Sequence, residues 1–311
     1  MKKAILILLF VQLVPLQLKA QEWFTSFEVA KRLALVQDKL LFVMWEGSME
    51  YDFPVAIFNK NGIAEIVLLS QDELVQQLIW EHFVPVKLPE YEYVQFSNQV
   101  KETRGIKYYN KLIDDSIKIM DVNGNILNTD ESLDKYYYPD EYGYLVIADF
   151  IMRYALDTSY LKHEFENYLR EKNFISRFYL ASKYLDYAIF AKKDIKPEIV
   201  SMSNIYFDEA KKILVADSTE NKPALFQKME LLEIKENLIL NKPYKARRQI
   251  KKIEEAQVDK MNLQLYAFIN YTISKYYGKE ENAALWESKI SSLDLRLSKL
   301  ILSQIGKTNS D

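Results

Sequence analysis

Three carboxylates lie close together in one loop of the N-terminal half. Glu46, Glu50 and Asp52 follow directly after a continuous apolar run. Paired carboxylates can act as general acid and general base, so this group could serve hydrolysis. Carboxylates in loops are more often simply solvated, and no substrate-binding motif accompanies these three. We therefore predict no catalytic residue, and we keep a hydrolase that uses these loop carboxylates as an alternative.

The same loop is unusually apolar. An exposed group of large apolar side chains marks a surface for a partner or ligand. We predict such a binding site here, and it comprises Trp45, Glu46, Met49, Glu50, Tyr51 and Phe53. Alternatively, these side chains tuck under residues 91–113, and the sequence leaves both readings open.

Other side chains that could carry chemistry are scarce. The chain has 0 Cys and 2 His, which excludes cysteine-based or histidine-rich metal sites and leaves few candidates for a catalytic base. His82 is expected at the boundary of the core, and His163, in a charged run, on the solvated surface. Phosphate-binding, dinucleotide-binding and nucleophile-elbow glycine patterns are absent from the sequence. We predict no cofactor and no metal.

Residues 121–125 contain Asp, Asn and Asn at alternate positions, as a calcium loop does. A calcium loop also needs glycine at its sixth position and glutamate at its twelfth, where this chain has Ile126 and Ser132. An Asn-Gly pair between two apolar runs is instead typical of a β-hairpin. The pattern favours a hairpin turn over a calcium site.

Strands and helices alternate around these residues. Apolar spacing predicts helices over residues 26–38, 68–81 and 141–156, the second with Leu74 and Leu78 on its apolar face. Short apolar runs predict strands over residues 39–45 and 83–88 and a hairpin over 116–127, and the first of these strands should be buried on both faces. The N-terminal half is therefore expected to be an α/β domain.

This half resembles a secreted thioredoxin-like domain. The resemblance rests on Trp23, on Ala30 and Ala34 within a helix, and on Lys39 before an apolar strand that ends at Trp45. Residues 83–88 and 116–127 are similar to the third strand and the final hairpin of that family. The similarity covers residues 21–157, within which residues 91–113 would be an inserted helix and loop.

The redox site of that family has no counterpart in this chain. Its Cys-X-X-Cys motif would begin where residues 46–51 read Glu-Gly-Ser-Met-Glu-Tyr. The proline that the family carries before the final hairpin is missing from residues 111–116. The resemblance implies the fold, whereas the absence of cysteine excludes thiol–disulfide oxidoreductase activity.

From about residue 158 the apolar spacing becomes helical throughout. Successive apolar faces are separated by short breaks, and the last comprises Trp286, Ile290, Leu293 and Leu297. Two segments resemble tetratricopeptide hairpins, because a turn residue is followed five positions later by alanine: Asn241 with Ala246, and Gly278 with Ala283. The predicted fold is an α/β thioredoxin-like N-terminal domain followed by an all-α helical-hairpin, tetratricopeptide-like C-terminal domain at residues 158–305. A plain helical bundle is the alternative, and residues 306–311 should be a flexible tail.

The first 20 residues have the layout of an export signal. Lys2 and Lys3 precede an apolar run too short to span a membrane, and Ala20 offers a cleavage point. An uncleaved anchor is the alternative. The protein is therefore expected to be periplasmic or secreted, with no membrane span after cleavage. Its net charge of −3 argues against nucleic acid as a partner.

The sequence thus favours a non-catalytic, exported interaction or scaffold protein of the cell envelope. Its partner is expected to be a protein or peptide, bound through the helical-hairpin domain or the loop that replaces the redox motif. The alternatives are the hydrolase described above and a cysteine-free periplasmic chaperone. A tyrosine-rich segment at residues 136–144 is expected to help fix the two domains together.

Overall fold

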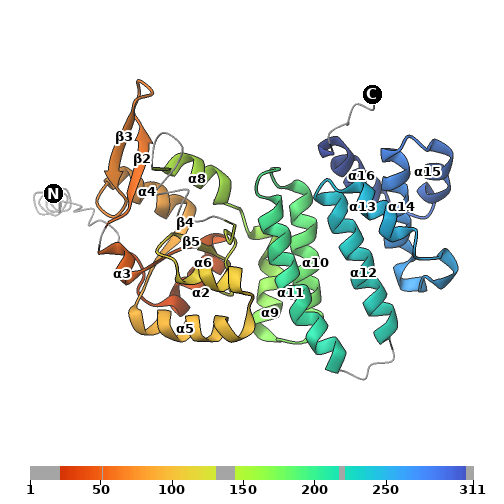
Figure 1. Ribbon diagram of the computed structural model, residues 1–311, viewed down its shortest axis with the longest axis horizontal. Helices are drawn as coiled ribbons and strands as arrows, with labels where there is room; N and C mark the ends of the chain where they lie inside the picture. The colour runs from red at the N-terminus through yellow and green to blue at the C-terminus, as the bar shows by residue number, and fades with distance from the viewer. Residues whose placement is uncertain (1–21, 51, 131–143, 217–220, 306–311) are drawn as a thin grey trace, which may run out of the picture.

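The computed structural model describes residues 22–50, 52–130, 144–216 and 221–305. An N-terminal α/β region with two small sheets is followed by a helical region beside it, as Figure 1 shows. This order agrees with the coarse prediction from the sequence. The export signal, Tyr51, the tail at 306–311 and nearly all of the tyrosine-rich segment lie outside the described residues.

The first sheet contains the strand expected to be buried on both faces. In this sheet β1 (Leu40–Trp45) lies between β4 (Phe83–Leu88), which runs parallel to it, and β5 (Lys118–Met120), which runs antiparallel. Helices α2 (Phe27–Gln37) and α4 (Glu73–His82) both pack against β4. Every β1 residue before Trp45 is buried, which confirms the interpretation of its continuous apolar run.

The second sheet was not expected. Strands β2 (Pro54–Phe58) and β3 (Ala64–Leu68) form a hairpin, and β6 (Leu145–Val146) pairs in parallel with β2. The predicted helix over 68–81 is therefore wrong at its start, because α4 begins only after Asp72, whose side chain accepts from the Val75 amide. Its buried face is also different: Val75 and Ile79 are fully buried, whereas Leu74 is 53% exposed.

The remaining N-terminal elements surround these sheets. Residues 91–113, expected as a helix and loop, form most of two helices, α5 (Glu90–Thr103) and α6 (Ile106–Ile113). A short helix, α3 (Glu46–Met49), follows β1, and α8 (Ile147–Tyr154) closes the region. The expected hairpin at 116–127 turns at Gly124 with φ +83°, but it returns only through an isolated bridge between Met120 and Ile126.

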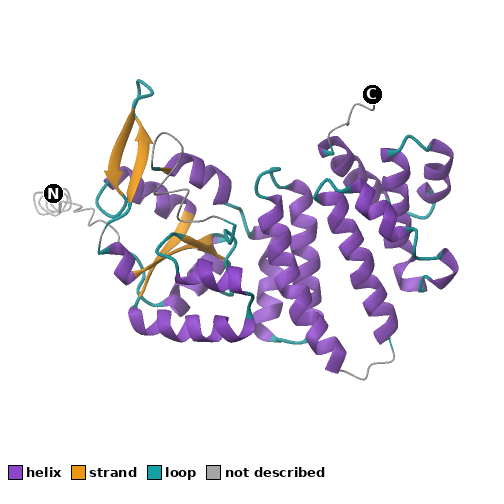
Figure 2. Cartoon of the chain, viewed as in Figure 1, coloured by secondary structure: helices purple, strands orange, loops and turns teal. Residues whose placement is uncertain are grey.

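The second region is built of helices, coloured purple in Figure 2. Its helices are η1 (Ser159–Leu161), α9 (Lys162–Arg170), α10 (Phe174–Phe190), α11 (Lys196–Ala216), α12 (Lys222–Ile239), α13 (Pro243–Ile250), η2 (Glu255–Gln257), η3 (Lys260–Asn262), α14 (Leu263–Tyr276), α15 (Glu280–Glu287) and α16 (Ser292–Gln304). Prolines open α12 and α13, where a missing amide hydrogen costs nothing. The last predicted apolar face is wrong, because it spans the break between α15 and α16.

Two helical hairpins occur where the turn residues indicated. Asn241 and Gly278 have φ of +56° and +65° and end α12 and α14, respectively. Ala246 and Ala283, five residues later, are buried, which lets each short second helix approach the first closely. The tight turns and small contact residues are thus observed features of the helical region.

The two regions share one hydrophobic core. Buried apolar side chains form a single cluster that extends from Phe27 in α2 to Ile305 after α16. Fully buried Tyr154, Phe165 and Tyr206 belong to the part of this cluster at the junction of the regions. None of the helices within the described ranges has the length and hydropathy that crossing a membrane requires.

Candidate functional site

The structure gives each loop carboxylate a different environment. Glu46 begins α3 and forms an ion pair with Lys87 at 3.4 Å. Asp52 accepts hydrogen bonds from the Ser70 amide and hydroxyl at 3.0 and 2.8 Å, so it holds the loop to the end of β3. Glu50 is exposed. Glu46 and Asp52 are thus each engaged with a partner within the protein, which gives no support to a role as an acid–base pair.

The apolar residues of the predicted binding loop are partly covered. Trp45 stacks on Tyr93 of α5 with ring centroids 5.1 Å apart, and Gly47 lies against the Trp45 ring so closely that a Cβ there would sit 2.6 Å from it. Met49 packs against the core, and Phe53 is buried. The loop therefore packs partly against residues 91–113, although Trp45 and Met49 retain partial exposure.

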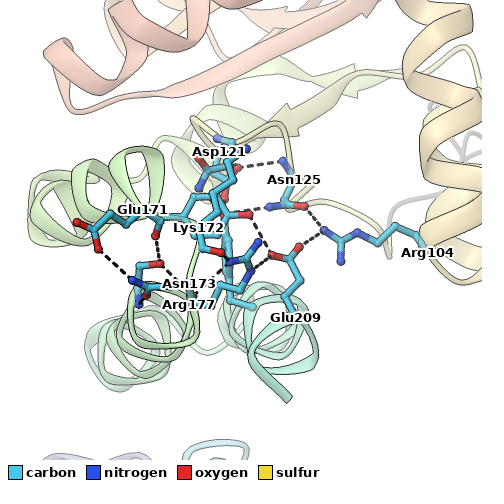
Figure 3. A network of polar contacts seen from close by, with 12 residues as sticks. Arg104, Asp121, Asn125, Glu171, Lys172, Asn173, Arg177 and Glu209 are labelled. Carbon is cyan, nitrogen blue, oxygen red and sulfur yellow. Dashed lines mark hydrogen bonds and ion pairs between the residues drawn. The ribbon is translucent and has the colours of Figure 1, made fainter. Parts of the chain in front are cut away.

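A second polar cluster joins the two regions and includes the carboxylate of Asp121 (Figure 3). One oxygen accepts from the Asn123 and Asn125 amides, both at 2.9 Å, which shapes the turn. The other accepts from the Tyr184 hydroxyl of α10 at 3.1 Å and the Tyr206 hydroxyl of α11 at 2.5 Å. Asp121 is fully buried, and this burial raises the pKa of its carboxyl.

An ion-pair network continues this cluster along α11. Glu209 accepts from Arg104 of the N-terminal region at 2.8 Å, from Arg177 of α10 at 3.2 Å and from the Tyr168 hydroxyl at 3.0 Å. Arg104 also donates to the Asn125 side chain at 2.8 Å, as Figure 3 shows. Each carboxylate oxygen of the cluster has protein donors. The cluster is thus an interregional anchor, and Asp121 holds a turn as the hairpin interpretation expected.

The opposite side of α11 lines an open groove. The groove encloses about 570 Å³ between α11 and α12 and is lined by Asn204, Phe207, Asp208, Lys211, Phe226, Met229, Glu230, Glu233 and Glu236. Phe207, Phe226 and Met229 are half-buried and provide an apolar surface, while Asp208, Glu230 and Glu233 are exposed. A volume of this size is within the range of ligand sites in proteins.

The groove is acidic. Four carboxylates and a single lysine contribute to its lining. Burial raises the pKa of the Glu236 carboxyl, the negative charge of Glu233 adds to this effect, and a hydrogen bond from Asn204 opposes it. The adjoining carboxylates give the groove a negative potential that attracts cations. The combination suits a positively charged ligand that also has apolar groups.

The groove was not predicted from the sequence. Tyr206 and Ala210 lie on the face of α11 that packs inward, whereas Met229 of α12 lines the groove. A weak signal was present in Phe207, which lies off that face and is followed by Asp208 and Lys211. An aromatic residue among charged ones on the solvent side of a helix indicates a partly covered surface.

Comparisons with protein-family models, curated proteins and solved structures gave no match to this chain. The candidate function therefore rests on the geometry of the groove and of the interregional anchor.

Proposed function

We propose that this protein is an exported, non-catalytic interaction protein that binds a basic segment of a partner protein or peptide in the groove between α11 and α12. The thioredoxin-like and tetratricopeptide-like assignments are part of this proposal. Paired antiparallel helices with positive-φ turns and buried alanines support the second assignment. The order of strands and helices around β1 supports the first.

The observation that carries the proposal is the lining of the groove. Apolar side chains of Phe207, Phe226 and Met229 lie beside four carboxylates, and the lining contains one lysine, Lys211. An occupant with alternating apolar and cationic side chains would bury the first group and pair with the second. A single-stranded nucleic acid would be repelled by the same carboxylates.

The hydrolase alternative gains no support from the positions of the loop carboxylates. Glu46 forms an ion pair with Lys87, and Asp52 accepts hydrogen bonds from Ser70. A general chaperone would also bind apolar segments, but it would bind them with little regard for charge. Charge preference therefore separates the two interaction hypotheses.

A binding titration with short peptides tests this proposal. Fluorescently labelled nine-residue peptides of alternating leucine and lysine, or leucine and glutamate, would be titrated with residues 21–311. We expect binding of the lysine peptide only, weakened by added salt. Equal affinity for the two peptides would favour the chaperone reading, and binding of neither would overturn the proposal.

Charge reversal locates the binding surface. In the double variant Glu230→Lys and Glu233→Lys, loss of two attractive contacts and gain of two repulsive ones should weaken the lysine peptide about tenfold. The matched control is Glu281→Lys with Glu287→Lys, two exposed glutamates of α15 outside the groove. An equal loss in both double variants would show that only net charge matters.

A further inference from the structure

A separate pocket lies where four helices of the second region meet. It encloses about 340 Å³ near the ends of α10, α12 and α16 and the start of α11. Its lining comprises Ala191, Lys192, Lys193, Lys196, Pro197, Ile239, Leu240, Asn241, Gln304 and Ile305. Half of these residues are apolar, three are lysines and none is acidic. This character is the reverse of the acidic groove.

Lys196 is the unusual member of this pocket. Its side chain is buried, with the residue only 5% exposed. The ammonium donates to the side-chain oxygen of Gln304 at 2.6 Å and to the Ile189 carbonyl at 3.3 Å. Gln304 in turn donates to the same carbonyl at 3.0 Å, which fixes the amide. An ammonium has three donors, so these contacts leave one N–H available.

The charge of Lys196 has no acidic partner in the described part of the chain. Its two acceptors are neutral oxygens, and none of the ion pairs among the described residues includes it. Burial lowers the pKa of its ammonium. Buried charges in proteins are normally paired, because an isolated one is costly to desolvate. The lysine is therefore available to an anion, which the described residues do not supply.

The other lining residues define that anion. Lys192 and Lys193 are exposed at the pocket, and Lys192 donates to the Met152 carbonyl at 3.2 Å. Ile239, Leu240 and Ile305 supply apolar surface, which a multiply charged, strongly hydrated anion would not use. A single charge attached to an apolar group fits both parts of the pocket.

We infer that this pocket binds a small apolar carboxylate, whose carboxylate pairs with the Lys196 ammonium and whose hydrocarbon part packs against Ile239, Leu240 and Ile305. The ligand is either a free monocarboxylic acid or the carboxyl terminus of a peptide that ends in an apolar residue. This inference does not depend on the acidic groove.

Calorimetric titration of residues 21–311 with octanoate tests this inference. Octanamide, which has the same length and no charge, is the matched ligand control, and N-acetyl-leucine represents a peptide terminus. We expect octanoate or N-acetyl-leucine to bind and octanamide to bind at least tenfold more weakly. Tighter binding of octanoate would identify a free monocarboxylic acid as the ligand, and tighter binding of N-acetyl-leucine would identify a peptide carboxyl terminus.

Two variants connect the binding to the pocket. Lys196→Met removes the charge, keeps an unbranched side chain one atom shorter and should weaken carboxylate binding about tenfold or more, whereas exposed Lys193→Met should weaken it about twofold. Lys252→Met, an exposed lysine outside the pocket, is the control and should have no effect. The Lys193 variant keeps the test meaningful if Lys196→Met fails to fold.

Several outcomes would overturn the inference. Absence of binding by both carboxylates at millimolar concentration would do so, as would equal binding of octanamide. If inorganic phosphate bound as tightly as octanoate, the hydrocarbon part of the ligand would contribute nothing to binding, which would contradict the inference. If the folded Lys196→Met variant bound octanoate with unchanged affinity, Lys196 would not be the residue that binds the carboxylate.

Discussion

Helix α11 meets different surroundings on its two sides. On one side, Tyr206 and Glu209 contact Asp121 and Arg104 of the N-terminal region, and both carboxylates there accept hydrogen bonds from protein donors. On the other side, Asp208 and Lys211 border the groove shared with α12. Helix α11 packs extensively against α10, whereas its packing against α12 is limited.

This difference separates two uses of charged residues. A carboxylate that is buried and receives several protein donors, as Asp121 does, has its hydrogen-bonding capacity filled and contributes to architecture. Exposed carboxylates beside half-buried aromatic rings, such as Glu230 and Glu233 near Phe226, retain capacity for a partner. If the comparison is correct, substitutions on the two sides should affect different measurements.

The largest effect is expected from Asp121→Ala. The substitution leaves the Tyr184 and Tyr206 hydroxyls and two turn amides without their buried acceptor, so we expect the free energy of unfolding to fall by about 3 kcal/mol. Urea denaturation of residues 21–311 measures this loss. Asp208→Ala, on the groove side, is the matched control and should change stability by less than about 0.5 kcal/mol. Equal losses would contradict the distinction between the sides.

A smaller loss is expected from Glu209→Ala. Removal of this carboxylate leaves Arg104 and Arg177 without their shared acceptor, but both guanidinium groups keep other oxygens as partners. We expect a loss of about 2 kcal/mol in the same urea experiment. Glu233→Ala provides the comparison in the groove and should be nearly neutral. A neutral Glu209→Ala would show that the network adds nothing to the anchor.

The anchor should also respond to pH in a definite direction. Because the pKa of folded Asp121 is raised above its usual value, the folded state holds this proton more tightly than the unfolded state. The contribution of Asp121 is therefore fully present below the unfolded pKa, near 3.8, and is lost as pH rises through the folded pKa. Asp121→Asn does not titrate, so wild-type stability should decline relative to this variant as the pH rises above the unfolded pKa near 3.8. A difference that stays constant, or grows in favour of the wild type, would contradict the assignment.

The sequence predicted the elements whose patterns are local. The buried strand at 40–45, the turn at Gly124 and the hairpins at Asn241 and Gly278 each depend on a few consecutive residues. The hairpin of β2 and β3 was missed because its second strand is largely exposed and has no apolar alternation. Because β3 occupies residues up to Leu68, α4 begins only at Glu73.

The interregional anchor and the groove could not be derived in the same way. Asp121 meets Tyr206 across 85 positions, and no local pattern specifies that contact. The tyrosine-rich segment was the nearest sequence signal for a junction, yet the described contacts are made by Tyr184 and Tyr206, one on each of two helices. The apolar face of a helix can be assigned from the spacing of its residues. Whether a groove remains between two neighbouring helices depends on how they pack in three dimensions.

The smallest effect on stability is expected from the groove double variant, Glu230→Lys with Glu233→Lys. Both side chains are exposed and neither forms an ion pair within the described residues, so unfolding in urea should shift by no more than about 0.5 kcal/mol. The same variant should lose about tenfold in affinity for the leucine–lysine peptide. A variant that binds poorly and is also unstable would mean that the groove carboxylates support the fold, and α11 would then be structural on both sides. If the variant loses peptide binding and keeps its stability, the groove side and the anchor side of α11 have separate roles. A helix that is packed equally on both sides could not lose binding without also losing stability.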